Sequence, residues 1–521
     1  MTKVLLELRP AFEGFAGIPQ ETRLLFRGLA ALPSIELEGL LQLSNRRLAK
    51  GLPQSRLTWW HRWPARRYNR MSRVVISLAD TPYQNIVDAV LDYVGRRAER
   101  MGLTMGTLFG LRTVPTTLFE TDGFEDFIWR TLFAKTLSPG DYAGVVSKQF
   151  RVCSTPWDSM HWAGLRTLNI LPSPMFPTID LDDCDIFIAQ TPYPARMRGR
   201  TKMVVRYHDA VPVFMPHTID DRSRHQAKHF FALAANVRSG AYFACVSDAT
   251  RADLLKLFPG ASARVVTIHN MVSHHYFLEI SSRRLVPGIL RSRVYDTDDP
   301  KNVDLKMNFL GEREKENFYR KAIGDGTFRY LLVVSTVEPR KNHARLLAAW
   351  EVLKAEVDPS LKLVVVGSLG WGIESLVPSL KSWMSRGELF MVEKVPAADL
   401  RVLYRHAAVT VCPSVGEGFD YSGVESMLSG GVVVASDIAV HREIYADAAV
   451  YFDPYSTRSL VSALSDLIYA DDAAATAERL RQAGQAVGAR YSPDVILPRW
   501  NAFLHHVAEG AHFVDGVIPT I

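Results

Sequence analysis

Short apolar runs recur along this chain, and each is followed by turn residues and then by apolar residues at helical spacing. The clearest run, 330–335, precedes Leu346, Leu347, Trp350 and Leu353, which would share one helix face. Similar runs lie at 4–8, 184–189, 203–207, 242–246, 265–268, 363–367 and 408–412. Strands that alternate with helices in this way predict an α/β protein built on parallel sheets.

The length of the chain predicts more than one domain, because 521 residues exceed what a single hydrophobic core normally organises. Residues 1–282 would form a first Rossmann-like domain, with an insertion at about 44–150. The charge-rich segment 283–327 reads as a linker with an excursion. Residues 328–490 would form a second domain, and 491–521 a last helix.

Glu417 and Glu425 bracket the glycine-bearing turn Glu417-Gly418-Phe419-Asp420, directly after the apolar run 408–412. This pattern predicts a strand, a tight loop and a helix, and ligands of open α/β sheets bind at such junctions. Backbone N–H groups at the helix start suit an anion. Two carboxylates would repel a bare phosphate, so we interpret them as acceptors for sugar or ribose hydroxyls. Alternatively, they are ordinary residues of a helix start.

Arg340 and Lys341 occupy a second junction of this kind, after the apolar run 330–335. Cations at a helix start interact unfavourably with the helix dipole. A function other than helix stabilisation must therefore favour this pair of cations here. An arginine fork beside a lysine suits a diphosphate.

The chain resembles the retaining GT-B glycosyltransferases of family four over about 325–470. The resemblance rests on Glu338-Pro339-Arg340-Lys341-Asn342, on the Glu417 and Glu425 pair, and on the segment 430–436. It implies two Rossmann-like domains that face a central cleft, and a final helix that crosses back to the first domain. Bacterial mannosyl- and rhamnosyltransferases belong to this family.

The resemblance also implies roles for individual residues. Glu417 would contact the donor sugar, Glu425 the nucleotide ribose, and Arg340 and Lys341 the diphosphate. The loop that holds Gly418, Phe419 and Asp420 would line the nucleotide-sugar site. Asp420-Tyr421-Ser422 stands where the family usually has Gly-Leu-Pro.

Two further candidates lie in the N-terminal half. Gly17 follows the first predicted strand, where the family brings a glycine-bearing loop to the donor phosphates; it could equally be an ordinary turn residue. His208 ends the run 203–207 and could donate a hydrogen bond to a sugar hydroxyl, whereas a lone histidine is more often structural.

The expected reaction is retaining transfer of a sugar from a nucleotide-sugar donor to a glycan or lipid-linked acceptor. Arg340 and Lys341 would supply the positive charge that the departing diphosphate requires, so we expect neither a metal ion nor a cofactor. The resemblance favours GDP- or dTDP-linked mannose or rhamnose and surface-polysaccharide synthesis such as that of O-antigen. A nucleotide-sugar epimerase and a non-catalytic partner subunit remain alternatives.

Composition adds little to this picture. The net charge of +6 does not demand a nucleic acid, and four scattered cysteines are typical of free thiols in a reducing compartment. We expect a cytoplasmic protein, since neither a leader nor a membrane span is evident. Tryptophans alternate with arginines within 56–73, which suggests peripheral contact with the inner face of a membrane; a packed surface loop is the alternative.

Overall fold

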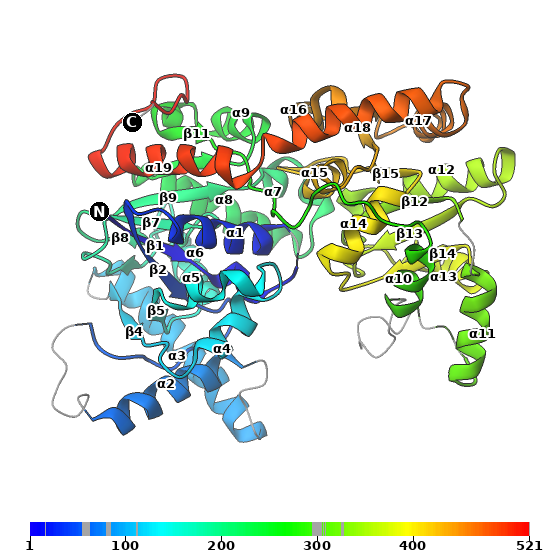
Figure 1. The fold of residues 1–521 in the computed structure, drawn as a ribbon. Coiled ribbons are helices and arrows are strands. Elements are labelled where there is room, and N and C mark those ends of the chain that lie inside the picture. The colour runs from blue at the N-terminus through cyan, green and yellow to red at the C-terminus, as the bar shows by residue number, and fades with distance from the viewer. Residues whose placement is uncertain are drawn as a thin grey trace.

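The computed structural model of the chain has two lobes, each built on one large sheet (Figure 1). The structure describes residues 1–15, 17–54, 63–79, 85–110, 113–293, 305, 307, 309–324 and 328–519. Two parallel α/β sheets are the architecture that the apolar runs predicted. The fold class is therefore confirmed.

The N-terminal lobe holds an eight-stranded sheet that is parallel except for its last strand, β4. In spatial order the strands are β11 (Val265–Thr267), β10 (Tyr242–Cys245), β9 (Lys202–Tyr207), β7 (Ile186–Ala189), β1 (Thr2–Glu7), β2 (Ile35–Leu41), β5 (Gln149–Cys153) and β4 (Thr116–Phe119). Most of their residues are buried, as expected where helices cover both faces of a sheet.

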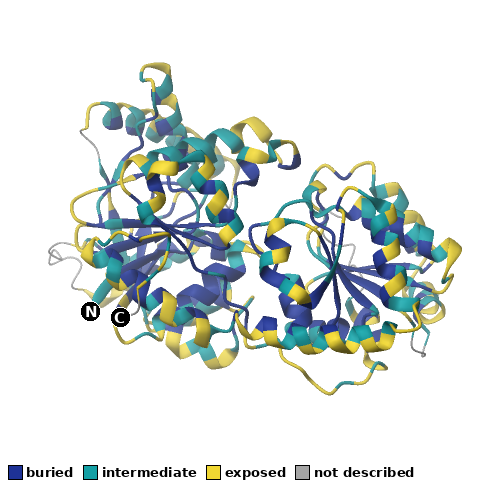
Figure 2. Ribbon diagram, turned by 90° about the horizontal axis from the view of Figure 1, so that it is seen from above, coloured by how far each residue is buried: buried dark blue, intermediate teal, exposed yellow. Residues whose placement is uncertain are grey.

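The C-terminal lobe holds a six-stranded sheet that is parallel throughout. Its order is β14 (Leu389–Val392), β13 (Lys362–Val366), β12 (Tyr330–Val334), β15 (Val409–Cys412), β16 (Val433–Ser436) and β17 (Ala449–Phe452). A third, small sheet joins β3 (Thr113–Val114), β6 (Thr178–Ile179) and β8 (Arg196–Met197). Figure 2 shows the two large sheets as buried layers between helices that are exposed on their outer sides.

Helices cover both large sheets. Those that belong to the N-terminal lobe are α1 (Ile18–Ala30), α2 (Pro64–Leu78), α3 (Ile86–Leu108), α4 (Glu125–Ile128), α5 (Tyr142–Val146), α6 (Trp157–Arg166), α7 (Val211–Phe214), α8 (Arg222–Arg238) and α9 (Asp248–Leu257). Those of the C-terminal lobe are α10 (Leu285–Arg293), α11 (Glu312–Ile323), α12 (His343–Glu356), α13 (Val377–Ser385), α14 (Ala397–His406), α15 (Tyr421–Leu428), α16 (Ala439–Tyr445), α17 (Thr457–Tyr469) and α18 (Ala473–Ala489).

The last helix, α19 (Pro493–Glu509), leaves the C-terminal lobe and lies along the N-terminal one (Figure 1). Its residues Trp500, Phe503, Leu504 and Val507 are buried in the core of the first sheet. The chain therefore crosses between the lobes twice, once near residue 270 and once before α19.

The segment 283–327, which we expected as a linker with an excursion, contains helices α10 and α11. Val286, Leu290, Tyr319 and Ile323 are buried and pack under the second sheet. Dense charge hides the apolar spacing of α11 in the sequence, whereas α10 is short and contains Pro287 and Gly288, which are untypical of a helix.

Candidate functional site

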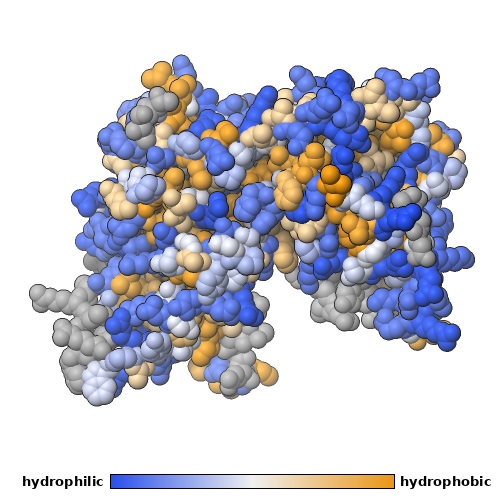
Figure 3. Space-filling view, viewed as in Figure 1, coloured by the Kyte–Doolittle hydropathy of each residue, from blue (hydrophilic) through white to orange (hydrophobic). Residues whose placement is uncertain are grey.

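The carboxyl ends of the two sheets face each other where the lobes meet. Strand β9 ends at Tyr207 and leads to His208, and the loop after β15 brings Gly418 against it. A Cβ atom on Gly418 would lie 1.6 Å from the carbonyl oxygen of His208, so only glycine permits this approach. Figure 3 shows a notch between the two lobes on one face of the molecule.

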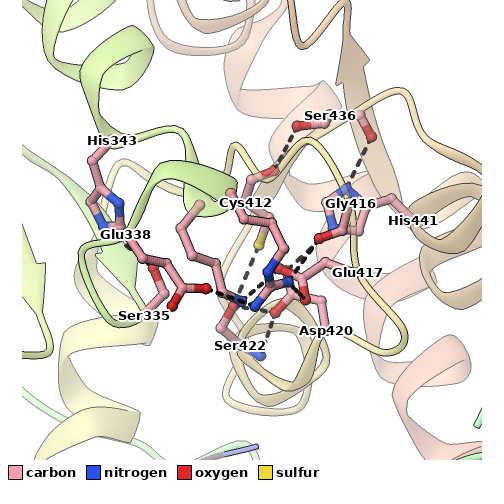
Figure 4. Close-up of polar contacts among 12 residues, drawn as sticks. Ser335, Glu338, His343, Cys412, Gly416, Glu417, Asp420, Ser422, Ser436 and His441 are labelled. Carbon is pink, nitrogen blue, oxygen red and sulfur yellow. Dashed lines mark hydrogen bonds and ion pairs between the residues drawn. The ribbon is translucent and has the colours of Figure 1, made fainter. Parts of the chain in front are cut away.

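Arg340 and Lys341 converge on the carboxylate of Glu417. Arg340 Nη1 donates to Glu417 Oε2 (2.6 Å), and Lys341 Nζ donates to Glu417 Oε1 (2.5 Å). Arg340 also donates to the carbonyl of Gly416 (2.7 Å) and to Glu338 Oε1 (2.8 Å). Figure 4 shows Glu338 and Glu417 on either side of this cluster.

The charges in this cluster are strongly coupled. The side chain of Glu417 is only 5% exposed. Burial alone would raise its pKa, but Arg340 and Lys341 outweigh burial and hold the pKa below the usual value. Burial raises the pKa of Glu338, which Arg340 only partly opposes. A pair of cations is therefore held here by carboxylates, at a point where an anionic ligand could replace those contacts.

Glu425 lies one helical turn into α15 and is buried. It accepts a hydrogen bond from Gln20 Nε2 (2.9 Å) and one from the hydroxyl of Tyr404 (3.3 Å). Burial raises the pKa of Glu425 to about 7, although these donors oppose the shift. Gln20 belongs to α1, so this contact joins the two lobes.

The segment Asp420-Tyr421-Ser422, which stands where the family usually has Gly-Leu-Pro, has a structural role. Asp420 is the N-cap of α15, and its Oδ1 accepts from the backbone N–H of Ser422 (3.1 Å). His441 Nε2 lies 3.4 Å from Asp420 Oδ2. Figure 4 shows both residues near Glu417. Burial would raise the pKa of Asp420, but the His441 contact and the charge of Lys341 lower it.

Tyr421 makes a second contact between the lobes. Its hydroxyl donates to Glu21 Oε2 (3.0 Å), while Arg206 Nε donates to Glu21 Oε1 (3.0 Å). All three side chains are buried. A phenol at this position thus replaces the family's usual leucine with a polar link to the first lobe.

His208 is partly buried beside this cluster. Burial lowers its pKa to about 3, with Arg206 adding to the effect, so its imidazole is neutral. Its Nε2 is buried and has no hydrogen-bond partner within the described structure. The imidazole is thus available for a hydrogen bond with a hydroxyl group.

The other two predicted residues, Gly17 and Phe419, form no hydrogen bond with this charged cluster in the described part of the chain. Gly17 is the N-cap of α1 and has φ +70°, a conformation that glycine adopts readily; a Cβ there would meet no atom within 4 Å. Phe419 packs its ring against Tyr421 and Tyr491, with centroids 5.1 Å and 5.3 Å away. Phe419 therefore supports the loop by packing.

Sequence reasoning missed the residues that reach the site from other elements. Glu338 was named only within a motif, although its carboxylate holds Arg340. Gln20 and Glu21 are contributed by a helix some 400 residues away from their partners. One feature of the sequence could have pointed to His441: it lies in the helix that follows the strand β16.

Comparison with known proteins finds a family match in the C-terminal lobe. Residues 314–487 match the family described as glycosyl transferases group 1. The chain is 26% identical to the O-antigen chain mannosyltransferase B of Escherichia coli over 290 residues, which cover 54% of this chain and 66% of that protein. It is 32% identical to the serotype-specific mannosyltransferase WbdA of Escherichia coli over 136 residues, 26% of this chain and 17% of that protein. The chain thus spans only part of the length of each of these relatives.

Solved structures agree on the fold. Sucrose-phosphate synthase from Thermosynechococcus elongatus has a TM-score of 0.55 at 13% identity, covering 98% of this chain and 100% of its own. The alpha,alpha-trehalose 6-phosphate synthase from Burkholderia multivorans has a TM-score of 0.51 at 12% identity, covering 98% and 100%. At such identities the likeness shows the GT-B fold alone. The chain therefore has the GT-B fold, and its residues 314–487 match the glycosyl transferases group 1 family.

Proposed function

We propose that this protein transfers a sugar, with retention of configuration, from a nucleotide-sugar donor to a saccharide acceptor. The observation that supports this most is the convergence of Arg340 and Lys341 on Glu417, opposite His208. These cations can stabilise the charge that builds on a departing diphosphate without a metal ion.

The contacts of Glu417 support a route by which a donor would bind. A diphosphate carries more negative charge than Glu417 and would compete for Arg340 and Lys341. That exchange would release the Glu417 carboxylate to accept hydrogen bonds from the donor sugar. Glu425 would accept from the ribose, in place of Gln20. Closure of the lobes over the donor would exclude water and limit hydrolysis.

The relatives suggest which substrates to test first. They are named as mannosyltransferases, of the O-antigen chain or serotype-specific. We propose GDP- or dTDP-linked mannose or rhamnose as the donor, and a growing glycan or lipid-linked saccharide of surface-polysaccharide synthesis as the acceptor.

Calorimetric titration with UDP-, GDP-, dTDP- and ADP-sugars tests the donor site. One class should bind, and Lys341→Ala and Glu425→Ala should each weaken that binding. The matched control is Lys381→Ala, an exposed lysine of the same lobe. NMR of the product made with an acceptor then reports the anomeric configuration. An altered sugar nucleotide formed without acceptor would indicate an epimerase, and binding without any turnover would indicate a non-catalytic subunit.

A further inference from the structure

The positive charge of this protein is concentrated in one segment. Residues 44–110 contain 12 of the 61 Lys and Arg residues but only 4 of the 55 Asp and Glu residues, a net charge of +8. Because the whole chain carries +6, the rest of it carries −2. Such a bias favours an anionic partner for this segment.

Helix α3, within this segment, leaves a long apolar stripe uncovered. Val87, Leu91, Val94, Met101 and Met105 follow one another at spacings of three, four or seven residues and so share one face. Each side chain is between 55% and 64% exposed. A 23-residue helix is about 35 Å long. Single exposed apolar residues need no explanation, but a stripe of this length does.

Arginines flank this stripe. A groove of about 540 Å³ runs between α3 and α6, with Met101, Met105 and Trp162 among its lining residues. Arg97, Arg100 and Arg166 also line it. The guanidinium of Arg166 lies 4.8 Å from the centroid of Trp162.

Two of the three carboxylates of α3 are already paired with arginines, and the third, Asp88, lies in the first turn and does not line the groove. Asp92 pairs with Arg96 (2.7 Å) and Glu99 with Arg47 (3.5 Å), within the same segment. Among the described residues, Arg97, Arg100 and Arg166 have no carboxylate partner. The groove therefore combines an apolar wall with three uncompensated cations.

The position of α3 leaves this face accessible. Helices α2 and α3 form the lower end of the N-terminal lobe in Figure 1, away from α18 and α19. In Figure 3, orange apolar residues come to the surface among blue polar ones at that end. No helix of the described chain is long and apolar enough to cross a bilayer.

We propose that α3 binds the surface of an anionic lipid bilayer, with its apolar stripe at the acyl-chain boundary and the neighbouring arginines on the lipid phosphates. A helix with an apolar face beside cations is suited to this position. This contact is distinct from the one expected at 56–73, which stays a prediction. Of that segment, residues 56–62 lie outside the described part of the chain, and α2 supplies charge rather than an apolar stripe.

A second copy of the chain fits the stripe less well. Two α3 helices packed face to face would bring Arg97, Arg100 and Arg166 of both copies together. Like charges at close range are destabilising, whereas lipid phosphates would neutralise them.

Vesicle co-sedimentation of the full chain tests the proposal. The protein should bind vesicles of phosphatidylcholine with one-third phosphatidylglycerol, and it should bind pure phosphatidylcholine vesicles far less. Added salt should weaken binding. The paired substitution Leu91→Glu with Met101→Glu should lower the affinity about tenfold or more, because it puts charge into the apolar stripe. Its control, Ile280→Glu with Leu310→Glu, changes two exposed apolar residues outside this lobe and should bind as wild type does.

A second pair isolates the charge. Arg97→Glu with Arg166→Glu should lower affinity for anionic vesicles about tenfold or more. The control, Arg313→Glu with Lys381→Glu, makes the same change in net charge on the C-terminal lobe. Thermal unfolding verifies that each variant is folded.

Wild-type binding that the α3 variants retain in full would overturn the proposal, as would failure of the folded wild type to bind anionic vesicles. A dimer in sedimentation velocity that Leu91→Glu dissociates would instead assign the stripe to self-association. Donor binding is measured separately and does not depend on α3, so this proposal and the transferase proposal can fail independently.

Discussion

Glu417 has two roles in the free protein, since it holds Arg340 and Lys341 in place and neutralises both. Glu417→Gln should therefore separate phosphate binding from turnover. With the carboxylate gone, both cations are available, so a nucleoside diphosphate should bind as tightly as to wild type or more tightly. Stability should fall by about 1–3 kcal/mol, because two mostly buried cations lose a partner.

Calorimetry with the nucleoside diphosphate of the preferred donor and thermal unfolding measure the two effects, and a turnover assay should show strong loss. Lys341→Ala is the contrasting variant, in which diphosphate binding itself should weaken. Weaker diphosphate binding by Glu417→Gln than by wild type, in a folded protein, would contradict the competition between carboxylate and phosphate.

Glu425 makes the site sensitive to pH near neutrality, because burial raises its pKa to about 7. In the proposed ribose-binding role, only the ionised carboxylate would accept from both hydroxyls, so nucleotide affinity should fall up to about tenfold per pH unit below 7. The pH dependence of folding stability has the opposite sign. Between the ordinary carboxyl pKa and about 7, the folded protein holds a proton that the unfolded chain has released, so stability declines as pH rises through this window.

Glu425→Gln should flatten both profiles between pH 5 and 8 while it weakens nucleotide binding. Calorimetry and chemical denaturation across this range provide the two profiles. A wild-type affinity that does not change with pH would mean that Glu425 does not bind the nucleotide in its ionised form.

At the scale of elements, the loop after β15 can contact the loop after β9 only because glycine occupies position 418. Gly418→Ala would place a Cβ atom 1.6 Å from the carbonyl oxygen of His208 and must push the two loops apart. We expect a stability loss of about 1–3 kcal/mol and a large loss of turnover.

Gly144→Ala is the matched control, since a Cβ at this position in α5 meets no atom within 4 Å and alanine favours a helix. It should leave stability unchanged or raise it slightly. Thermal unfolding and turnover of both variants test this. Unchanged stability and turnover of Gly418→Ala would mean that the two loops are not in close contact.

The elements that sequence could predict are those whose information is local. Apolar runs such as 330–335 and 408–412 mark buried parallel strands, since such strands are apolar on both faces. Helix α11 escaped prediction because it buries only two residues among many charges, and α10 because it is short and contains Pro287 and Gly288. Contacts such as Gln20 with Glu425 depend on how the lobes dock, which no local pattern encodes.

At the scale of the molecule, the lobes are joined by polar contacts around the site and by an apolar cluster that contains Val246 of the first lobe and Val424 of the second. Gln20 donates to Glu425, and Tyr421 donates to Glu21, both at the start of α1. Farther along, Trp371 Nε1 donates to the carbonyl of Thr218 (3.1 Å). Polar interfaces of this kind accommodate relative motion of domains more readily than apolar ones.

Glu443 on α16 accepts three hydrogen bonds from the N-terminal lobe. It accepts from the backbone N–H groups of Asp248 (2.7 Å) and Ala249 (2.9 Å) at the start of α9, and from His269 Nε2 (2.8 Å). A carboxylate at a helix N-terminus is favourable, so this contact holds the two lobes together at a point outside the proposed chemistry.

Glu443→Ala should therefore shift the protein toward an open arrangement of its lobes. Loss of about 1–3 kcal/mol at the interface would raise the ratio of open to closed molecules about fivefold or more. Small-angle scattering should report a larger radius of gyration, and saturating donor should restore the compact form because it bridges both lobes. Glu478→Ala removes an exposed carboxylate of α18 and should change neither. If Glu443→Ala scatters as wild type does in the absence of donor, the lobes are held by the contacts around α1 instead, and Tyr421→Phe becomes the substitution that should open them.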